Sequence, residues 1–366
     1  MVELDSIQTE IKYIEDEIKN TQYNKATQHH VGLLKAKLAK LKEKQIARSS
    51  GGKKGEGFSV KKSGDATVIL IGFPSVGKST LLNRLTNAES KTAAYAFTTL
   101  TCIPGLMTYN HAKIQILDVP GILKGAAAGT GRGKEVLSVV QSADLVLFVL
   151  DVFQAEVQLE VLKKELYDSH LRLDQRKPEV VIKKASKGGV RVATTTKISM
   201  IDKKTVEAIF KEFKIMNADV IIREDINSDQ LIDLIENNKK YLPSLVAINK
   251  VDLAQNAQLE TVLQKIPGIP ISAEENLNIP LLKQKLFEAL CFIRIYLKEV
   301  GKKADMEVPI IMRQGDTIRS LCDKIHKDFV SKFKFAKLWG SSKFPGQKVG
   351  LDVPIKDKDV VEIHVR

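Results

Sequence analysis

One stretch of the sequence constrains the fold more than any other. An apolar run rich in Val and Ile leads into a glycine-bounded loop and then a helical pattern, ATVILIGFPSVGKSTLLNRL. Residues 72–79 match G-x-x-x-x-G-K-[ST] in the strand–loop–helix context of a phosphate-binding loop, whose N–H groups face phosphate oxygens. We expect Lys78 to neutralise the β- and γ-phosphates and the Ser79 hydroxyl to bind Mg²⁺. The sequence therefore predicts an α/β domain with a mostly parallel sheet and a nucleotide site.

The identity of the base is predicted by the segment NKVD, which follows another strand rich in Val, Ile and Leu. The Asp252 carboxylate can accept from N1–H and the 2-amino group of guanine, whereas adenine would leave it unpaired. We expect Asn249 to brace the loops and contact N7, and the stem of Lys250 to pack over the purine plane. The later segment ISAEEN would close over the base, with the Ala273 amide at guanine O6. GTP is therefore the predicted ligand.

Two more segments are expected to sense the γ-phosphate. Asp118 ends a predicted strand, where it can hold Mg²⁺ through a water, and the Gly121 amide can donate to the γ-phosphate. In the segment AFTTLT we choose Thr99 over Thr98 as the residue that reaches both Mg²⁺ and the γ-phosphate. Both segments are expected to switch between ordered and disordered states on hydrolysis.

The predicted site draws on all of these segments. The predicted nucleotide contacts are Gly72, Phe73, Pro74, Ser75, Val76, Gly77, Lys78, Ser79, Thr80, Asp118, Gly121, Asn249, Lys250, Asp252, Ser272, Ala273 and Glu274. The predicted Mg²⁺ ligands are Ser79, Thr99 and Asp118, and the predicted catalytic groups are Lys78, Thr99 and Gly121.

Composition limits the class of protein. With 43% hydrophobic and 28% charged residues the chain has the balance of a soluble globular protein. No apolar run approaches the roughly 18 residues that a membrane span needs. The acidic start is unlike a signal peptide, and three cysteines without CxxC spacing argue against a disulfide framework or a structural zinc site. We expect a monomer in the reducing cytoplasm.

Positive charge is concentrated near the N-terminus. Of the net +13, residues 19–62 contribute +10, with twelve Lys or Arg against two acidic residues. Helical spacing is shown by two apolar sets, Ile7, Ile11, Ile14 and Ile18, then Leu34, Leu38 and Leu41. They predict a helical hairpin, followed by a Gly/Ser/Lys linker. The excess charge is either a solvated helix face or a surface for phosphate backbones, and we favour RNA or ribosome binding.

The quoted motifs, together with FTTLTCIPG and DVPGILKGAAAGTGRGKE, resemble those of the developmentally regulated GTP-binding protein (Drg) family of Obg-related GTPases. The resemblance extends over nearly the whole chain. It implies an N-terminal helix-turn-helix, an inserted domain similar to domain 2 of ribosomal protein S5, and a C-terminal TGS domain of the β-grasp type. It also implies association with translating ribosomes.

The spacing of the motifs supports an insertion, because 97 residues separate Asp151 from Asn249, more than a minimal G domain needs. Residues 178–226 read as a hairpin around Gly188-Gly189, an amphipathic helix and a strand, and the tail reads as the strands and helix of a β-grasp. The expected domains are residues 1–62 (basic helical hairpin and linker), 63–170 (first part of the G domain), 171–227 (inserted domain), 228–292 (second part of the G domain) and 293–366 (TGS domain).

One position departs from Ras-type GTPases, which orient the attacking water with a glutamine after the switch glycine. This chain has Ile122 there. Obg-like GTPases share such a hydrophobic residue, so the resemblance implies slow intrinsic turnover. What positions the water stays open among a backbone group of residues 125–133, Arg132 as an internal finger, a protein partner and K⁺. Related enzymes that use K⁺ rely on a P-loop asparagine, where this chain has Ser75.

Two functions from different classes follow. The favoured one is a GTPase that hydrolyses GTP to GDP and phosphate and acts as a switch on ribosomes or RNA in translation. Its expected cofactors are Mg²⁺ and, as a candidate, K⁺, and a regulatory protein is a candidate partner. The alternative is an RNA-binding or ribosome-assembly scaffold in which GTP only stabilises one conformation. Neither function involves a membrane.

Overall fold

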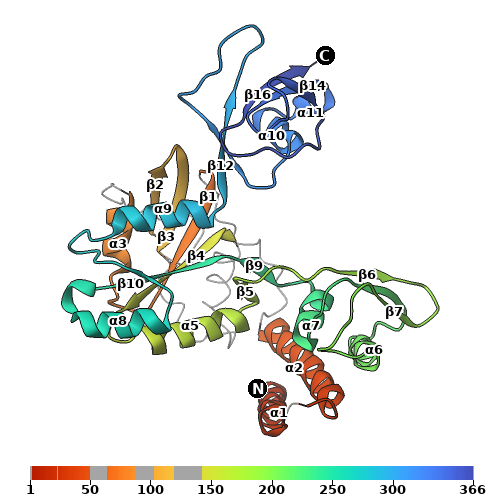
Figure 1. Ribbon diagram of the computed structural model, residues 1–366. Helices are drawn as coiled ribbons and strands as arrows, with labels where there is room; N and C mark the ends of the chain where they lie inside the picture. The colour runs from red at the N-terminus through yellow and green to blue at the C-terminus, as the bar shows by residue number, and fades with distance from the viewer. Residues whose placement is uncertain (1, 23, 50–63, 87–102, 119–141, 366) are drawn as a thin grey trace. The chain divides into compact units, whose positions relative to one another are not determined.

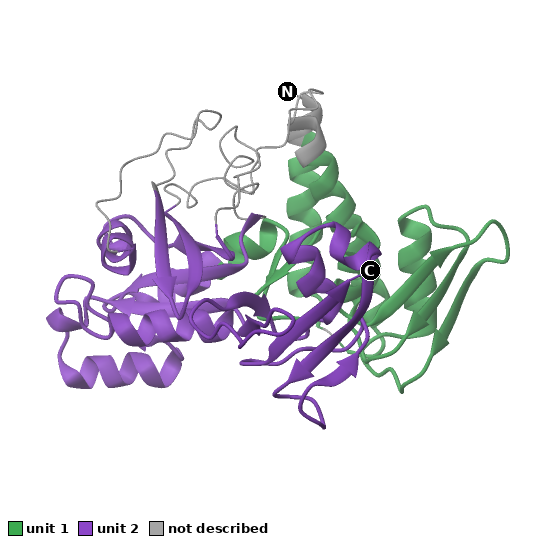
Figure 2. Ribbon diagram, turned by 90° about the horizontal axis from the view of Figure 1, so that it is seen from above, with its two compact units in different colours: residues 1–58, 122–141, 163–242 green, residues 59–121, 142–162, 243–366 purple. Residues whose placement is uncertain are grey.

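The computed structural model of the protein describes residues 2–22, 24–49, 64–86, 103–118 and 142–365 (Figure 1). The chain divides into two compact units, which Figure 2 colours separately. Within the described residues, unit 1 comprises residues 2–49 and 163–242, and unit 2 comprises residues 64–118, 142–162 and 243–365.

Unit 2 contains a six-stranded sheet with the strand order β11-β10-β4-β1-β3-β2. Its strands are β1 (Ala66–Ile71), β2 (Ile103–Tyr109), β3 (Ala112–Asp118), β4 (Leu145–Asp151), β10 (Ser244–Asn249) and β11 (Ile269–Pro270). β2 is antiparallel to β3, and the other pairs are parallel. Every residue of β1 is buried, as expected for a parallel strand covered on both faces. The predicted α/β fold with a mostly parallel sheet is confirmed.

Helices cover both faces of this sheet (Figure 1). On one face, α3 (Lys78–Thr86) and α9 (Ile279–Ala289) bury leucines in the same core as the inward residues of the strands. On the other face lie α8 (Asn256–Lys265) and the first half of α5 (Ala155–Asp168), which continues into unit 1. Because the central strands are parallel, their carboxyl ends meet at one edge, where open α/β sheets bind ligands.

The C-terminal part of unit 2 is a mixed five-stranded sheet with the order β13-β12-β16-β14-β15. Its elements are β12 (Phe292–Leu297), β13 (Ile310–Arg313), α10 (Ile318–Ile325), α11 (Asp328–Ser331), β14 (Phe333–Trp339), β15 (Gln347–Val349) and β16 (Val360–Val365). Leu321 and Cys322 of α10 share a buried core with Ala336 and Leu338 of β14. The helix and strands that the sequence predicts for the tail are present.

Unit 1 combines the predicted helical hairpin with the inserted segment. Its elements are α1 (Val2–Asn20), α2 (Gln28–Ser49), β5 (Leu171–Leu173), β6 (Val180–Lys184), β7 (Val190–Thr194), α6 (Lys203–Glu212), β8 (Ala218–Ile222), α7 (Ser228–Glu236) and β9 (Lys240–Leu242). The sequence assigned residues 228–242 to the second part of the G domain, whereas α7 and β9 pack within unit 1. Among the described residues, no helix has the length and apolar character that crossing a membrane would require.

The expected hairpin around Gly188-Gly189 is wrong. β6 and β7 do not pair with each other, because β8 lies between them, antiparallel to β6 and parallel to β7. Residues 185–189 therefore bridge two strand spacings of about 4.8 Å each, which a tight two-residue turn cannot do. The alternate residues of β8 are fully buried, so this strand takes the centre. The glycine pair indicated a chain reversal but not the pairing partner.

The helical hairpin also packs differently from the sequence prediction. The expected leucine stripe of α2 is only half-buried, whereas Val31 and Ala36 are buried. A Cβ on Gly32 would come 2.8 Å from the methyl carbon of Thr205, so the absence of a side chain lets α2 lie close to α6. α2 is therefore held between α1 and the inserted segment, and does not pair with α1 alone.

The lysines of α2 form ion pairs within unit 1. The pairs are Lys35–Asp229 at 2.6 Å, Lys37–Glu10 at 2.8 Å, Lys40–Glu212 at 2.8 Å and Lys42–Glu15 at 2.8 Å. Because these pairs are partly exposed, each adds little to stability. They nevertheless neutralise much of the positive charge that the sequence analysis counted toward a phosphate-binding surface.

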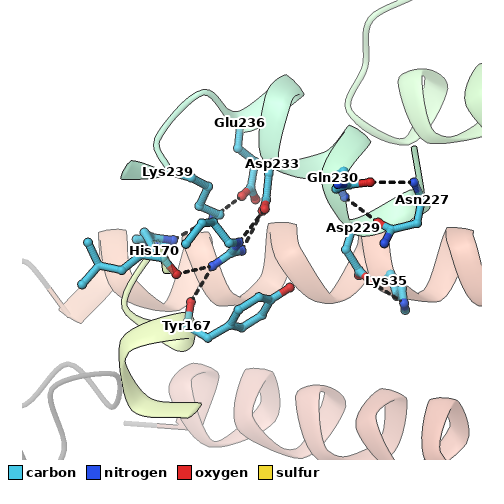
Figure 3. Close-up of polar contacts among 11 residues, drawn as sticks. Lys35, Tyr167, His170, Asn227, Asp229, Gln230, Asp233, Glu236 and Lys239 are labelled. Carbon is cyan, nitrogen blue, oxygen red and sulfur yellow. Dashed lines mark hydrogen bonds and ion pairs between the residues drawn. The ribbon is translucent and has the colours of Figure 1, made fainter. Parts of the chain in front are cut away.

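A buried polar cluster lies beside the parallel pair β5–β9, where the chain enters and leaves the inserted segment (Figure 3). The Arg172 guanidinium donates to both carboxylate oxygens of Asp233, at 2.6 and 2.7 Å, and to two backbone carbonyls. Lys239 Nζ donates to Glu236 at 2.5 Å and lies 2.7 Å from Nδ1 of His170. Burial, then the charges of Lys239 and Arg172, lower the pKa of His170 to about 4, so its neutral ring accepts from Lys239.

Candidate nucleotide-binding site

The loop between β1 and α3 has the backbone of a phosphate cradle. Ser75 and Gly77 have positive φ angles of 63° and 92°. A Cβ on Gly72 would come 2.3 Å from the carbonyl oxygen of Val149, and one on Gly77 would come 2.4 Å from Nδ2 of Asn249. Neither glycine position has room for a side chain. The loop ends at the first turn of α3, whose unpaired N–H groups favour an anion.

Lys78 occupies the inside of this loop. Its Nζ donates to the carbonyl oxygens of Gly72 and Phe73 at 3.0 and 2.9 Å. Burial lowers the pKa of Lys78, and the charge of Asp118 acts in the opposite direction. The ammonium group can exchange these carbonyls for phosphate oxygens, which are stronger acceptors because they are charged.

Ser79 and Asp118 form a pair that fits Mg²⁺. Asp118 is the last residue of β3, and its Oδ2 accepts from Ser79 Oγ at 2.8 Å. The other oxygen, Oδ1, is buried and has no hydrogen-bond partner among the described residues. A buried acceptor without a partner is unfavourable, and hydroxyl and carboxylate oxygens are the ligands that Mg²⁺ prefers. The two residues would hold the ion together with phosphate oxygens and water.

Asn249 links the phosphate loop to the predicted base loop. It ends β10 and is buried, its Nδ2 donates to the carbonyl of Val76 at 2.8 Å, and its Oδ1 accepts from the Ala273 N–H at 2.9 Å. The sequence expected the Ala273 amide to reach guanine O6. In this structure that amide is held by Asn249, so the side chain of Asn249 fixes the two loops relative to each other.

Asp151 is a site residue that the sequence analysis missed. Lys250 has a positive φ of 65°, and its Nζ lies 2.8 Å from Oδ2 of Asp151. Asp151 ends β4 in register with Asn249 on β10, and its Oδ1 accepts from the N–H of Phe153 at 3.0 Å. The signal was an acidic residue directly after the apolar run LVLFVL. Asp151 therefore holds the ammonium of Lys250, whose stem the sequence predicts over the purine.

The remaining predicted base contacts follow β10 and β11. Asp252 is exposed in the short 3-10 helix η1 (Val251–Leu253). Ser272 is buried and exchanges backbone hydrogen bonds with Leu277, at 3.2 and 3.0 Å, which closes the loop of residues 273–276. These contacts give the predicted base loop a defined shape.

The structure places most of the predicted site along the carboxyl edge of the sheet. The predicted residues that it describes there are Gly72, Phe73, Pro74, Ser75, Val76, Gly77, Lys78, Ser79, Thr80, Asp118, Asn249, Lys250, Asp252, Ser272, Ala273 and Glu274. Thr99, Gly121, Ile122 and Arg132 lie outside the described residues, so their roles stay predictions.

Fold and site together define a P-loop GTPase. A family model described as a 50S ribosome-binding GTPase matches residues 67–184, and a model of the C-terminal region of that domain matches residues 187–292. A TGS domain model matches residues 293–365. The GTPase domain with a C-terminal TGS domain, predicted from the sequence, is therefore confirmed.

Relatives of known name cover nearly the whole chain. An uncharacterized GTP-binding protein of Methanocaldococcus jannaschii is 53% identical over 98% of this chain and 93% of its own length. Developmentally-regulated G-protein 3 of Arabidopsis thaliana is 45% identical over 98% of this chain and 99% of its own. Developmentally-regulated GTP-binding protein 2 of Homo sapiens is 44% identical over 96% and 98%. The chain belongs to the developmentally regulated GTP-binding protein family.

Proposed function

We propose that this GTP-binding protein hydrolyses GTP to GDP and phosphate with Mg²⁺ bound, turns over slowly by itself, and acts as a switch on ribosomes or other RNA. We further propose that it works as a monomer in the cytoplasm. The observation that carries hydrolysis is the buried, unpartnered oxygen of Asp118 beside Ser79, at the end of the phosphate loop. It supports a metal-assisted phosphate site more directly than a site that only binds guanine.

The described residues have separate parts in this proposal. Lys78 would leave its two carbonyl acceptors and donate to the β- and γ-phosphates, where its charge stabilises the transferring group. Asn249, Lys250 and Asp252 would select guanine. Bound Mg²⁺ would supply charge neutralisation at the phosphate oxygens. Binding and charge stabilisation thus both come from the carboxyl edge of the sheet.

The position of the attacking water is the reason for proposing slow turnover. Ile122 cannot orient water by a hydrogen bond, because its side chain has neither donor nor acceptor. We propose that a backbone group of the glycine-rich segment or a partner supplies this contact, with Arg132 and K⁺ as further candidates. A regulatory partner that orders this segment would then set the rate.

Binding to RNA is supported by charge and by the family description. The matching model is described as a ribosome-binding GTPase, and the chain carries a net +13. Because the lysines of α2 are paired, we propose that the phosphate contacts of unit 1 come mainly from the inserted segment. Four of its lysines have no ion-pair partner within the part of the chain that the structure describes: Lys183, Lys184, Lys187 and Lys197.

A single-turnover assay tests the proposal. Hydrolysis of bound GTP is measured with Mg²⁺ or EDTA, with and without ribosomes, and in K⁺ and then Na⁺ buffers. We expect slow hydrolysis that requires Mg²⁺ and is faster with ribosomes. Absence of hydrolysis in all conditions, with ribosome binding that depends on bound GTP, would favour the alternative of an RNA-binding or assembly scaffold.

A further inference from the structure

The last turn of α3 carries an arginine that contacts the predicted base loop. Arg84 Nε donates to the carbonyl oxygen of Ala273 at 3.0 Å, and its Nη2 donates to that of Glu274 at 2.7 Å. The acceptors belong to consecutive residues, and the planar guanidinium presents its N–H groups in a fork that matches two such oxygens. A lysine ammonium has no such geometry. The contact is therefore a two-point clamp on the backbone of the loop.

The helix connects this clamp to the phosphate site. Lys78 lies in the first turn of α3, and Arg84 follows six residues later, about 9 Å along the axis at 1.5 Å per residue. Between them, Leu81 and Leu82 are fully buried in the core under the sheet, and Leu85 follows them. The same short helix is thus anchored by its leucines, faces the phosphates at one end and holds the base loop at the other.

The clamp acts on the outer side of a loop whose inner side is already held. Asn249 accepts from the Ala273 N–H, and the bonds between Ser272 and Leu277 close the base of the loop. Arg84 takes the carbonyl of the same alanine. Because the Arg84 side chain is exposed, its two bonds compete with water and can open without disturbing the core.

We propose that Arg84 is a positioning residue for guanine recognition. By holding residues 273 and 274 against α3, it keeps the base loop closed and lengthens the time that a guanine nucleotide stays bound. This inference rests on the proposed guanine site, which Arg84 does not itself touch. It acts on the base side, so contacts to the phosphates should be independent of it.

The test compares three variants of the full chain. Arg84→Met keeps the length of the stem and removes the donors, Arg84→Lys keeps the charge without the fork, and Arg319→Met is a matched control. Arg319 is another exposed arginine of unit 2, paired with Asp352 at 3.1 Å in the C-terminal sheet domain. The measurements are the dissociation rate of fluorescent GDP and the inhibition of GDP binding by tripolyphosphate, which has phosphates but no base.

We expect Arg84→Met to release GDP about three- to tenfold faster, equivalent to about 0.7–1.4 kcal/mol. Arg84→Lys should fall between this variant and the parent protein, and Arg319→Met should match the parent. The affinity for tripolyphosphate should be the same in all four proteins, whereas a general disturbance of α3 would weaken it together with GDP.

Three results would overturn the inference. The first is a GDP dissociation rate of folded Arg84→Met within twofold of the parent, and the second is an equal loss of GDP and tripolyphosphate binding. The third is the absence of a preference for GDP over ADP in the parent, which would remove the guanine site and the clamp with it. Asp252→Asn separates these cases. If it switches preference to xanthosine diphosphate while Arg84→Met behaves as the parent, the guanine site stands and only the clamp is rejected.

Discussion

The ion pair between Arg172 and Asp233 gives a prediction whose size can be worked out from the structure. Both side chains are buried, with 5% and 7% of their surfaces exposed. The guanidinium donates twice to the carboxylate and twice to backbone carbonyls, and it lies 3.7 Å from the centre of the Tyr167 ring. The substitution Asp233→Ala would leave the Arg172 charge buried and without its counter-ion.

Removal of one partner from a buried ion pair typically costs about 3–5 kcal/mol, because the remaining charge loses its compensation. The double variant Arg172→Met with Asp233→Leu removes both charges and keeps most of the volume. We expect it to regain more than half of that loss. The asymmetry between the single and double variants distinguishes a buried charge effect from a simple loss of packing.

Hydrogen–deuterium exchange followed by mass spectrometry measures this effect locally, which suits a chain of two units better than one unfolding midpoint. Peptides that cover residues 167–174 and 228–242 should exchange faster by a factor of about 10² or more, since each 1.4 kcal/mol is a factor of ten. Peptides from residues 333–349 in unit 2 are the internal control. GDP affinity should not change, because the described nucleotide contacts lie in unit 2.

A loss below about 1 kcal/mol for Asp233→Ala would contradict the reasoning, since exposed ion pairs already contribute that much. A double variant that is as unstable as the single one would also contradict it. In that case shape, and not the unpaired charge, would hold β5 and β9 together.

Three further predictions concern the base, the chemistry and the RNA surface. Asp252→Asn should lose GTP affinity and gain xanthosine triphosphate, whose O2 can accept from the new amide; unchanged GTP affinity would remove Asp252 from the base site. Ile122→Ala should change single-turnover hydrolysis by less than about tenfold, since no hydrogen bond is lost. Lys78→Ala should reduce it by about a hundredfold or more. A thousandfold loss for folded Ile122→Ala would show that this side chain shapes the water site. Charge reversal of the three lysines nearest the β6–β7 loop should flatten the salt dependence of ribosome binding by about 0.7–0.9 in slope per lost phosphate contact. An unchanged slope would place the phosphate contacts elsewhere. The lysines to reverse are Lys183, Lys184 and Lys187.

Many of the predicted phosphate and base residues were accessible from the sequence because their chemistry is local. In GFPSVGKS, eight successive residues supply the glycine positions, the lysine and the hydroxyl, and no distant residue is needed to recognise the pattern. The buried parallel strands were equally local, since a strand covered on both faces must be apolar throughout. The residues after Asp118 show the limit of such patterns, because Ile122 signals only what is missing.

Tertiary structure decided the contacts between segments far apart in the chain. Lys250 and Asp151 are 99 residues apart, and Arg84 lies 189 residues from Ala273, so no local spacing indicates either contact. The same holds for β8, which enters between β6 and β7 and cancels the hairpin suggested by two glycines. The buried face of α2 depends on whether α6 lies against it, and Gly32 has meaning only beside Thr205. Periodicity and turn residues report how a segment folds, whereas its partner is chosen by the burial and charge that the other segments bring to it.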